Sequence, residues 1–172
     1  MSEETDIFLN DTWSLYFHDP DNSNWGIESY ILISTISSVH DWLKVFEHFK
    51  DEWHKGMFFL MREHIQPIWE DKHNSNGGCI SFKIWKNELK DSWFEFSSKI
   101  LGETLLNKEY INNWENICGV SISPKRKFCI ARIWLSNDTN IYQENYNFNF
   151  PLYTSTLYKS HIDNKDYEEK TE

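Results

Sequence analysis

Short stretches in which apolar and polar residues alternate recur along the chain. Trp13, Leu15 and Phe17 occupy every second position of the first one, a pattern typical of a β-strand with one buried face. Pro124 and its two basic neighbours separate two later stretches and indicate a hairpin turn. The pattern predicts strands over residues 12–17, 30–36, 56–61, 79–85, 117–123, 127–135 and 152–158.

Two other stretches carry apolar residues at spacings of three and four, as an amphipathic helix requires. Ser38 is a suitable N-cap for the first, which presents Trp42 and Phe46 on one face. The second is predicted over residues 88–106, with Trp93 on its apolar face. Strands interrupted by two helices favour one α+β domain in which helices cover one face of an antiparallel sheet.

Length and charge narrow the classes of protein that fit this pattern. The chain has 172 residues, about one domain, and a net charge of −10. An acidic surface repels phosphate, so we expect no DNA partner, and any contact with nucleic acid must be local. The sequence has no apolar run of membrane-spanning length, no evident secretory signal and no CxxC pair among its three cysteines. We therefore expect a cytoplasmic monomer with free thiols, no metal and no cofactor.

Two tryptophans lie in segments that are predicted to be loops. Trp25 follows a run rich in Asp, Asn, Pro and Ser, and Trp69 belongs to the long connection 62–77. An indole exposed in a loop is unfavourable unless it folds back into the core or binds a ligand. Both explanations are open for each ring at this point.

A carboxylate next to the second indole favours a planar, hydrogen-bonding ligand. Glu70 follows Trp69 and can accept hydrogen bonds from the N1–H and N2–H₂ donors of a guanine whose face stacks on the indole. Methylation at N7 makes that base cationic, and indole faces then add a cation–π attraction of about 2 kcal/mol when water is excluded. A sugar-binding module also uses tryptophan platforms beside carboxylates, so the residues alone leave that class open.

An ordered series of motifs resembles one known family. The motifs are DTWSLYF at 11–17, Trp25, IQPIWED at 65–71, glycines 77–78, WFE at 93–95, ILGE at 100–103, ICGV at 117–120 and IW at 133–134. In order and nearly in spacing they resemble the translation initiation factor 4E family, over about residues 13–163. The resemblance implies a curved antiparallel sheet whose concave face binds the 7-methylguanosine cap of mRNA, with helices on the convex face. It also implies a short N-terminal arm at 1–10, a cap-binding domain at 11–163 and a charged, disordered tail at 164–172.

By position, the resemblance assigns roles in binding the cap base. Trp25 and Trp69 correspond to the stacking pair, and Glu70 corresponds to the acceptor for the base edge. Trp134 corresponds to the residue that contacts the N7-methyl group. His161, in the segment SHID at 160–163, corresponds to a weak contact near the second nucleotide.

The basic positions that bind the cap triphosphate in the family are altered here. Ile130 and Cys79 occupy two of them, and Arg132, on the same strand face as Ile130, is expected to substitute. The alternative for the segment 124–127 is a merely solvated turn. The expected phosphate-binding residues are Lys125, Arg126, Lys127 and Arg132.

The face that binds a partner protein in the family differs further from the family's residue pattern. The positions of that face are Val39, Leu43, Phe94 and Gly102, and Leu43 stands where the family has a tryptophan. The resemblance therefore implies a scaffold protein of the initiation factor 4G type with an altered binding motif. It implies a translation initiation factor that recruits capped mRNA to the ribosome, in the host-cell cytoplasm if the source is viral. The alternative is a cap-binding translational repressor that does not recruit the usual scaffold.

The sequence shows no constellation typical of an enzyme. We find no nucleophile beside a base and no glycine-rich phosphate loop. The nearest group of metal-ligand types is Glu47, His48, Glu52 and His54, which the helical pattern assigns to a solvated face. We therefore expect a binding protein without catalytic activity.

Overall fold

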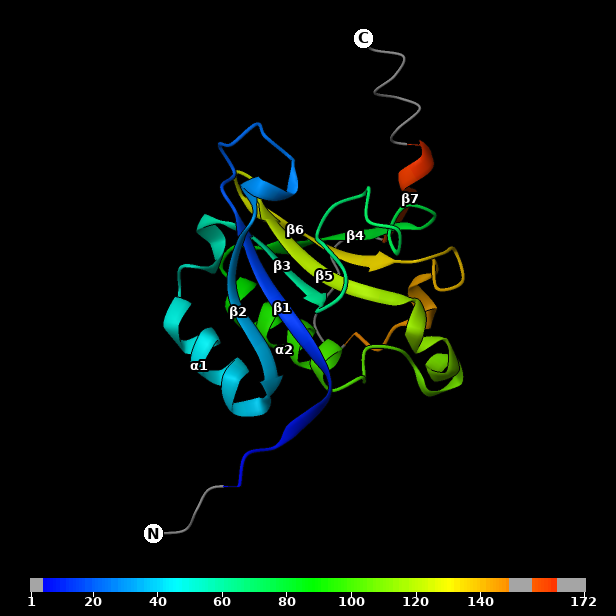
Figure 1. The fold of residues 1–172 in the computed structure, drawn as a ribbon, viewed down its shortest axis with the longest axis horizontal. Helices are drawn as coiled ribbons and strands as arrows, with labels where there is room; N and C mark the ends of the chain where they lie inside the picture. The colour runs from blue at the N-terminus through cyan, green and yellow to red at the C-terminus, as the bar shows by residue number, and fades with distance from the viewer. Residues whose placement is uncertain (1–4, 149–155, 164–172) are drawn as a thin grey trace.

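One curved antiparallel sheet of seven strands organises the molecule (Figure 1). The structure is a computed structural model that describes residues 5–148 and 156–163. The strands follow the order β2-β1-β3-β5-β6-β4-β7 across the sheet. Their bounds are Phe8–His18 (β1), Ile31–Ser38 (β2), Met57–Arg62 (β3), Gly78–Trp85 (β4), Ile117–Pro124 (β5), Phe128–Leu135 (β6) and Leu157–Ser160 (β7). The predicted α+β class is confirmed.

Two α-helices pack against the main core. Helix α1 (Val39–Phe49) follows β2 directly, and the Ser38 hydroxyl accepts a hydrogen bond of 3.1 Å from the Asp41 amide at its N-terminus. Helix α2 (Leu89–Leu101) contacts β1, β4 and β5. It ends before the predicted limit at residue 106, because Gly102 caps it and Glu103 adopts a φ of 57°. The described residues also contain four 3-10 helices: η1 (Ile27–Ser29), η2 (Trp53–Lys55), η3 (Lys108–Asn116) and η4 (Gln143–Asn145).

Alternation along the central strands divides the apolar side chains between two layers. Every residue of β3 is buried, and Phe58 and Leu60 belong to the main core shared with α1 and α2. Phe59 and Met61 point to the opposite face and join a smaller cluster. The buried members of this second cluster are Met57, Phe59, Met61, Ile65, Cys79, Cys118 and Trp134. The sheet therefore has an apolar floor on the side away from its helices.

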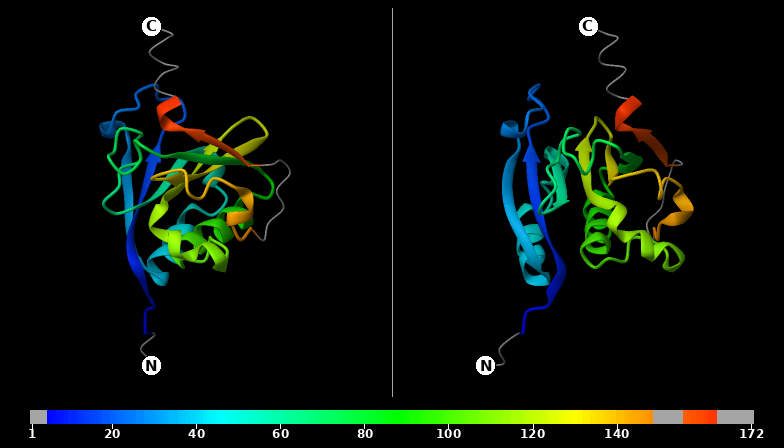
Figure 2. Two further views of the ribbon diagram at one scale, coloured as in Figure 1. Left: turned by 90° about the vertical axis from the view of Figure 1, so that its right-hand side faces the viewer. Right: turned by 45° about the vertical axis from the view of Figure 1, so that its right-hand side comes forward.

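Three segments lie at the end of the molecule opposite its N-terminal residues. They are the β1–β2 connection, the β3–β4 connection and residues 157–163; in the right-hand view of Figure 2 the β3–β4 connection lies between the other two. These segments are far apart in sequence, and the sheet brings them to one rim above the second cluster.

Strands β1 and β7 differ most from their predicted bounds. Strand β1 begins at Phe8, so residues 8–10 belong to the sheet rather than to an arm; Phe8 pairs with Ser38 across the ladder. Strand β7 spans Leu157–Ser160 instead of 152–158, because its pairing partner is residues 78–81 of β4. Residues 152–155 and the tail 164–172 lie outside the described residues.

A buried arginine joins three parts of the fold. The guanidinium of Arg62 on β3 forms an ion pair with Asp11 on β1. It donates hydrogen bonds to the backbone carbonyls of Trp114 (3.1 Å) and Ile117 (2.6 Å). The indoles of Trp13 and Trp114 flank it, with ring centroids at 5.2 and 5.6 Å. The charge is removed from water but paired, so it fixes the junction of η3 with the sheet.

Replacing Arg62 with Met should lower the free energy of unfolding by about 3–5 kcal/mol. Met fills a similar volume but removes the ion pair with Asp11 and the two hydrogen bonds to buried carbonyls. Urea unfolding followed by circular dichroism measures the loss. As a control, Arg126→Met in the exposed β5–β6 turn should change stability by less than about 0.5 kcal/mol. Equal losses in the two variants would contradict the role given to Arg62.

Candidate ligand-binding site

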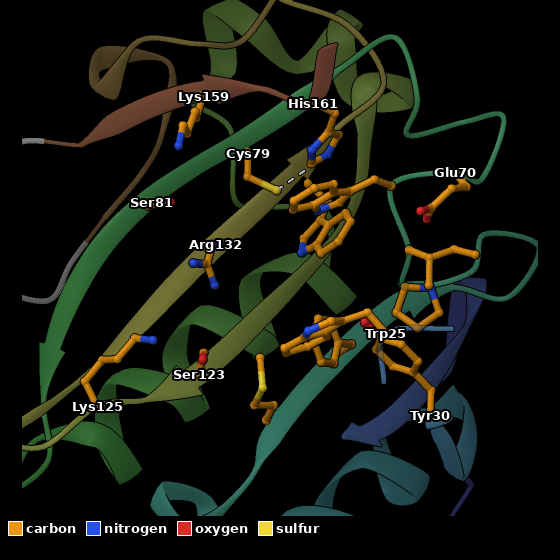
Figure 3. A pocket seen from close by; sticks show the side chains of 16 residues that line it. Trp25, Tyr30, Glu70, Cys79, Ser81, Ser123, Lys125, Arg132, Lys159 and His161 are labelled. Carbon is orange, nitrogen blue, oxygen red and sulfur yellow. Dashed lines mark hydrogen bonds between the residues drawn. The ribbon is translucent and has the colours of Figure 1, made fainter. Parts of the chain in front are cut away.

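A pocket of about 550 Å³ opens above the second apolar cluster (Figure 3). Strands β3, β4, β5, β6 and β7 supply its floor and one wall, and the two long connections supply its rim. Its lining residues are Trp25, Tyr30, Met57, Phe59, Pro67, Ile68, Trp69, Glu70, Cys79, Ser81, Ser123, Lys125, Arg132, Trp134, Lys159 and His161.

Trp25 stands at the rim with one face supported by a buried histidine. Its ring stacks on that of His18, with 4.3 Å between centroids and 6° between planes. The same imidazole lies 2.7 Å from the Asn24 carbonyl through Nε2, and the Asn24 side chain accepts a hydrogen bond of 2.9 Å from the Gly26 amide. Trp25 remains 52% exposed. It therefore does not fill the core, and its other face is open to a ligand.

Trp69 is half-buried and is also supported by a histidine. Its ring stacks on His161 with a centroid distance of 5.7 Å and an interplanar angle of 23°. The loop that carries it is held by Asn74, whose amide donates to the carbonyls of Gln66 and Ile68, both at 2.9 Å. Side-chain hydrogen bonding thus replaces regular secondary structure in this connection.

Asp71 stiffens the same loop from its other side. Its carboxylate accepts hydrogen bonds from the amides of Gln66 (2.9 Å) and His73 (2.8 Å). Burial opposes ionisation of this group, but these hydrogen bonds hold the pKa of Asp71 below its ordinary value. The loop is therefore organised before any ligand binds.

Glu70 presents its carboxylate at the pocket rim. It is exposed, and within the described part of the chain it accepts no hydrogen bond from the protein. Burial, together with the negative charge of Glu70, raises the pKa of Tyr30 to about 12. Because no described residue donates a hydrogen bond to Glu70, both of its carboxylate oxygens are available to a ligand that carries donors.

Trp134 forms part of the pocket floor. It is 4% exposed, and its indole N–H donates a hydrogen bond of 3.0 Å to the Ser121 hydroxyl on β5. The Phe59 ring packs against it at an angle of 68°. The orientation of Trp134 is fixed by these contacts, and only a small part of the ring faces the pocket.

The opposite wall of the pocket is cationic. Lys125 and Arg132, both expected from the sequence, line it, and Lys159 on β7 joins them. Arg126 and Lys127 are exposed in the β5–β6 turn and do not line the pocket. Sequence reasoning missed Lys159 because nothing in a four-residue strand indicates that it pairs with β4.

His161 and Cys79 meet inside the pocket wall. His161 is 1% exposed, and its Nε2 lies 3.8 Å from the Cys79 sulfur. Burial raises the pKa of the Cys79 thiol far above its ordinary value, so the thiol stays protonated and is a poor nucleophile. The position of His161 behind Trp69 is that of a support, and its contact with a second nucleotide stays a prediction.

The predicted partner face lies on the helices, away from the pocket. Val39 and Leu43 are exposed one turn apart on α1. Phe94 on α2 is 38% exposed, and its ring contacts that of Phe46 on α1 at 4.8 Å. Gly102 is the exposed C-cap of α2. The structure therefore links the two helices through aromatic contact and leaves apolar side chains uncovered on both.

Two features are absent from the described residues. No helix there is both long and apolar enough to cross a membrane. No group of three or more His, Cys, Asp or Glu side chains in residues 5–148 and 156–163 is arranged to hold a metal ion.

Known proteins share this sequence pattern. The eukaryotic translation initiation factor 4E homolog of Acanthamoeba polyphaga mimivirus is 32% identical over 141 residues, which cover 69% of this chain and 51% of the viral protein. The chain thus spans about half the length of that relative. Eukaryotic translation initiation factor 4E of Xenopus laevis is 24% identical over 171 residues, covering 90% of this chain and 77% of the frog protein.

Solved structures share the fold. A complex of C. elegans eIF4E-3 with the 4E-binding protein Mextli and a cap analog has a TM-score of 0.75 at 21% identity, covering 94% and 96% of the two chains. Schistosome eIF4E complexed with m7GpppA and 4E-BP has a TM-score of 0.76 at 19% identity, covering 95% and 92%. The family model described as eukaryotic initiation factor 4E matches residues 8–172. Because this match includes nearly all of the chain, the protein belongs to the eukaryotic initiation factor 4E family.

Proposed function

We propose that this protein binds the 7-methylguanosine cap of mRNA in its pocket. The observation that carries the proposal is the division of the pocket into two chemically different sides. Aromatic rings and one carboxylate occupy one side, and three cations occupy the other (Figure 3). A cap is divided in the same way, since a planar cationic base is joined to a triphosphate. Membership of the family supports the same ligand.

The base is bound by Trp25, Trp69 and Glu70. The indoles stack on its two faces, at about 1–3 kcal/mol per base–aromatic stack. The cationic ring gains a further cation–π attraction, which ordinary guanine lacks. Glu70 accepts from the N1–H and N2–H₂ donors, and the exposed part of Trp134 contacts the N7-methyl group. Binding requires no chemical step, metal or cofactor.

The role in the cell is translation initiation, with recruitment of capped mRNA through a scaffold of the initiation factor 4G type. We place the protein in the cytoplasm, where capped mRNA is translated, and treat it as a monomer. The alternative is a cap-binding repressor, which the altered partner face favours because Leu43 replaces an aromatic anchor. Addition to a translation extract depleted of its own cap-binding factor separates the two: an initiation factor restores translation of capped mRNA, whereas a repressor does not.

The isolated protein should bind 7-methylguanosine triphosphate about 30-fold more tightly than GTP, which corresponds to a cation–π contribution of about 2 kcal/mol. Quenching of tryptophan fluorescence measures both affinities. Equal affinities for the two nucleotides would overturn the proposed function.

The same titration on two variants locates the binding surface. Trp25→Ala should weaken binding of the methylated nucleotide about ten- to hundredfold. Trp85→Ala removes a partly exposed indole of β4 that does not line the pocket, and it should leave binding unchanged. Normal binding by a folded Trp25→Ala protein would show that this ring does not stack on the base.

Replacing Glu70 with Gln should weaken binding of the methylated guanine nucleotide about tenfold or more. The amide keeps the shape of the side chain, removes its charge and places an N–H₂ donor against the donor edge of the base. Calorimetric titration measures the change. Glu63→Gln alters an exposed carboxylate of the same connection outside the pocket and should have no effect. Equal effects of the two variants would assign the base edge to another residue.

A peptide carrying the standard scaffold motif should bind this protein only weakly, with a dissociation constant in the micromolar range or above. Leu43 offers such a helix less aromatic contact than a tryptophan, and aromatic anchors dominate interfaces of this kind. Leu43→Trp should increase the affinity, as measured by fluorescence anisotropy of the labelled peptide. Nanomolar binding by the unmodified protein would show that the usual scaffold site is intact.

A further inference from the structure

We propose that Lys159 binds the phosphate chain of the ligand and supplies, with Lys125 and Arg132, a third positive charge at this end of the pocket. The inference rests on the proposed function, because it concerns the other half of the same ligand. Strand β7 pairs with β4, and this pairing places Lys159 directly opposite Cys79.

One row of residues crosses three strands at this level of the sheet. Lys159 on β7 pairs with Cys79 on β4, and Cys79 pairs with Trp134 on β6. Residues that are directly opposite in an antiparallel ladder point to the same face. Cys79 and Trp134 belong to the second apolar cluster under the pocket. Lys159 therefore projects into the pocket beside its floor. Two strand spacings, or about 10 Å, separate its position in the sheet from that of Trp134.

A second row brings the arginine next to it. Arg132 on β6 pairs with Ser81 on β4, two residues beyond Cys79 on the same face. Lys125 is the first residue of the β5–β6 turn. In Figure 3 the three cationic side chains lie along one side of the pocket, and Glu70 lies on the other. The cations thus come from the β5–β6 turn, from β6 and from β7, and they face a common space.

These three charges have no carboxylate partner among the described residues. Within residues 5–148 and 156–163, no Asp or Glu oxygen lies within 4 Å of Lys125, Arg132 or Lys159. The chain as a whole carries a net charge of −10, so the positive charge of this pocket wall is opposite in sign to that of the protein. Mutual repulsion of the three is relieved by an anion that bears several charges. A triphosphate meets that condition better than a monophosphate.

Cys79 itself contributes no charge to this wall. Burial raises the pKa of its thiol far above neutrality, so the side chain is neutral and smaller than a lysine or arginine. The space above it is open to the flexible, four-carbon side chain of its neighbour across the ladder. Lysines on edge strands also serve to prevent pairing with other chains, and β7 is an edge strand. That explanation predicts no effect of Lys159 on ligand binding.

The test compares nucleotides that share a base and differ in phosphate number. Binding of 7-methylguanosine monophosphate and triphosphate is measured by calorimetry for the wild type, Lys159→Gln and Lys159→Arg. We expect Lys159→Gln to weaken triphosphate binding about three- to tenfold and monophosphate binding by less than about twofold, with Lys159→Arg close to the wild type. Lys44→Gln makes the same change of charge on α1, outside the pocket, and should match the wild type. Unchanged thermal unfolding of each variant establishes that it is folded.

A second probe separates this inference from the proposed function. Inorganic triphosphate alone is titrated into the wild type and Lys159→Gln, with weaker binding expected for the variant. Weaker binding supports the inference even if the wild type fails to prefer methylated over unmethylated guanine, a failure that would overturn only the proposed function. Identical binding of every phosphate-bearing probe by Lys159→Gln and the wild type would overturn the role of Lys159 and leave edge protection as its explanation. Equal losses for monophosphate and triphosphate would overturn it as well.

Discussion

The two-residue period of the β-strand is the constraint on which this molecule depends. A central strand such as β3 cannot put Phe58 and Leu60 into the helix-covered core without sending Phe59 and Met61 to the other face. The same alternation on β4 and β6 places Cys79 and Trp134 next to them. The pocket floor is therefore the reverse side of the core, and a shift of register by one residue would disrupt both.

Two loops form the rim of the pocket whose floor the sheet supplies. The two rim tryptophans extend from connections without long regular elements, yet each is supported by a buried imidazole and each loop is held by side-chain amides or carboxylates. Such support reduces the conformational entropy that a ligand must remove when it binds. The proposed binding of a polyanion by an acidic chain depends on pocket cations that form no ion pair with a carboxylate of the described residues.

The sequence predicted local structure well and non-local pairing poorly. Alternation located the strands from β1 to β6, and Ser38 located the start of α1, because both signals are contained in neighbouring residues. The end of α2 was missed because the backbone of Gly102 and Glu103 stops the helix while apolar residues continue beyond it. Lys159 was missed because its position beside Cys79 arises from a contact between residues distant in the chain. For the two rim tryptophans the residues left two explanations open; the family resemblance favoured a ligand, and the exposure of Trp25 excludes a place in the core.

Strand β7 carries Lys159, and one residue beyond its end the chain reaches His161, which supports Trp69. Detachment of this short edge strand from β4 would therefore disturb the base end and the phosphate end of the pocket together. A ligand that contacts both ends of the pocket stabilises the attached strand through two sets of contacts. A fragment that contacts one end stabilises it through one set only. The base and the phosphate chain are then coupled through the protein, and their separate affinities need not multiply to give the affinity of the whole cap.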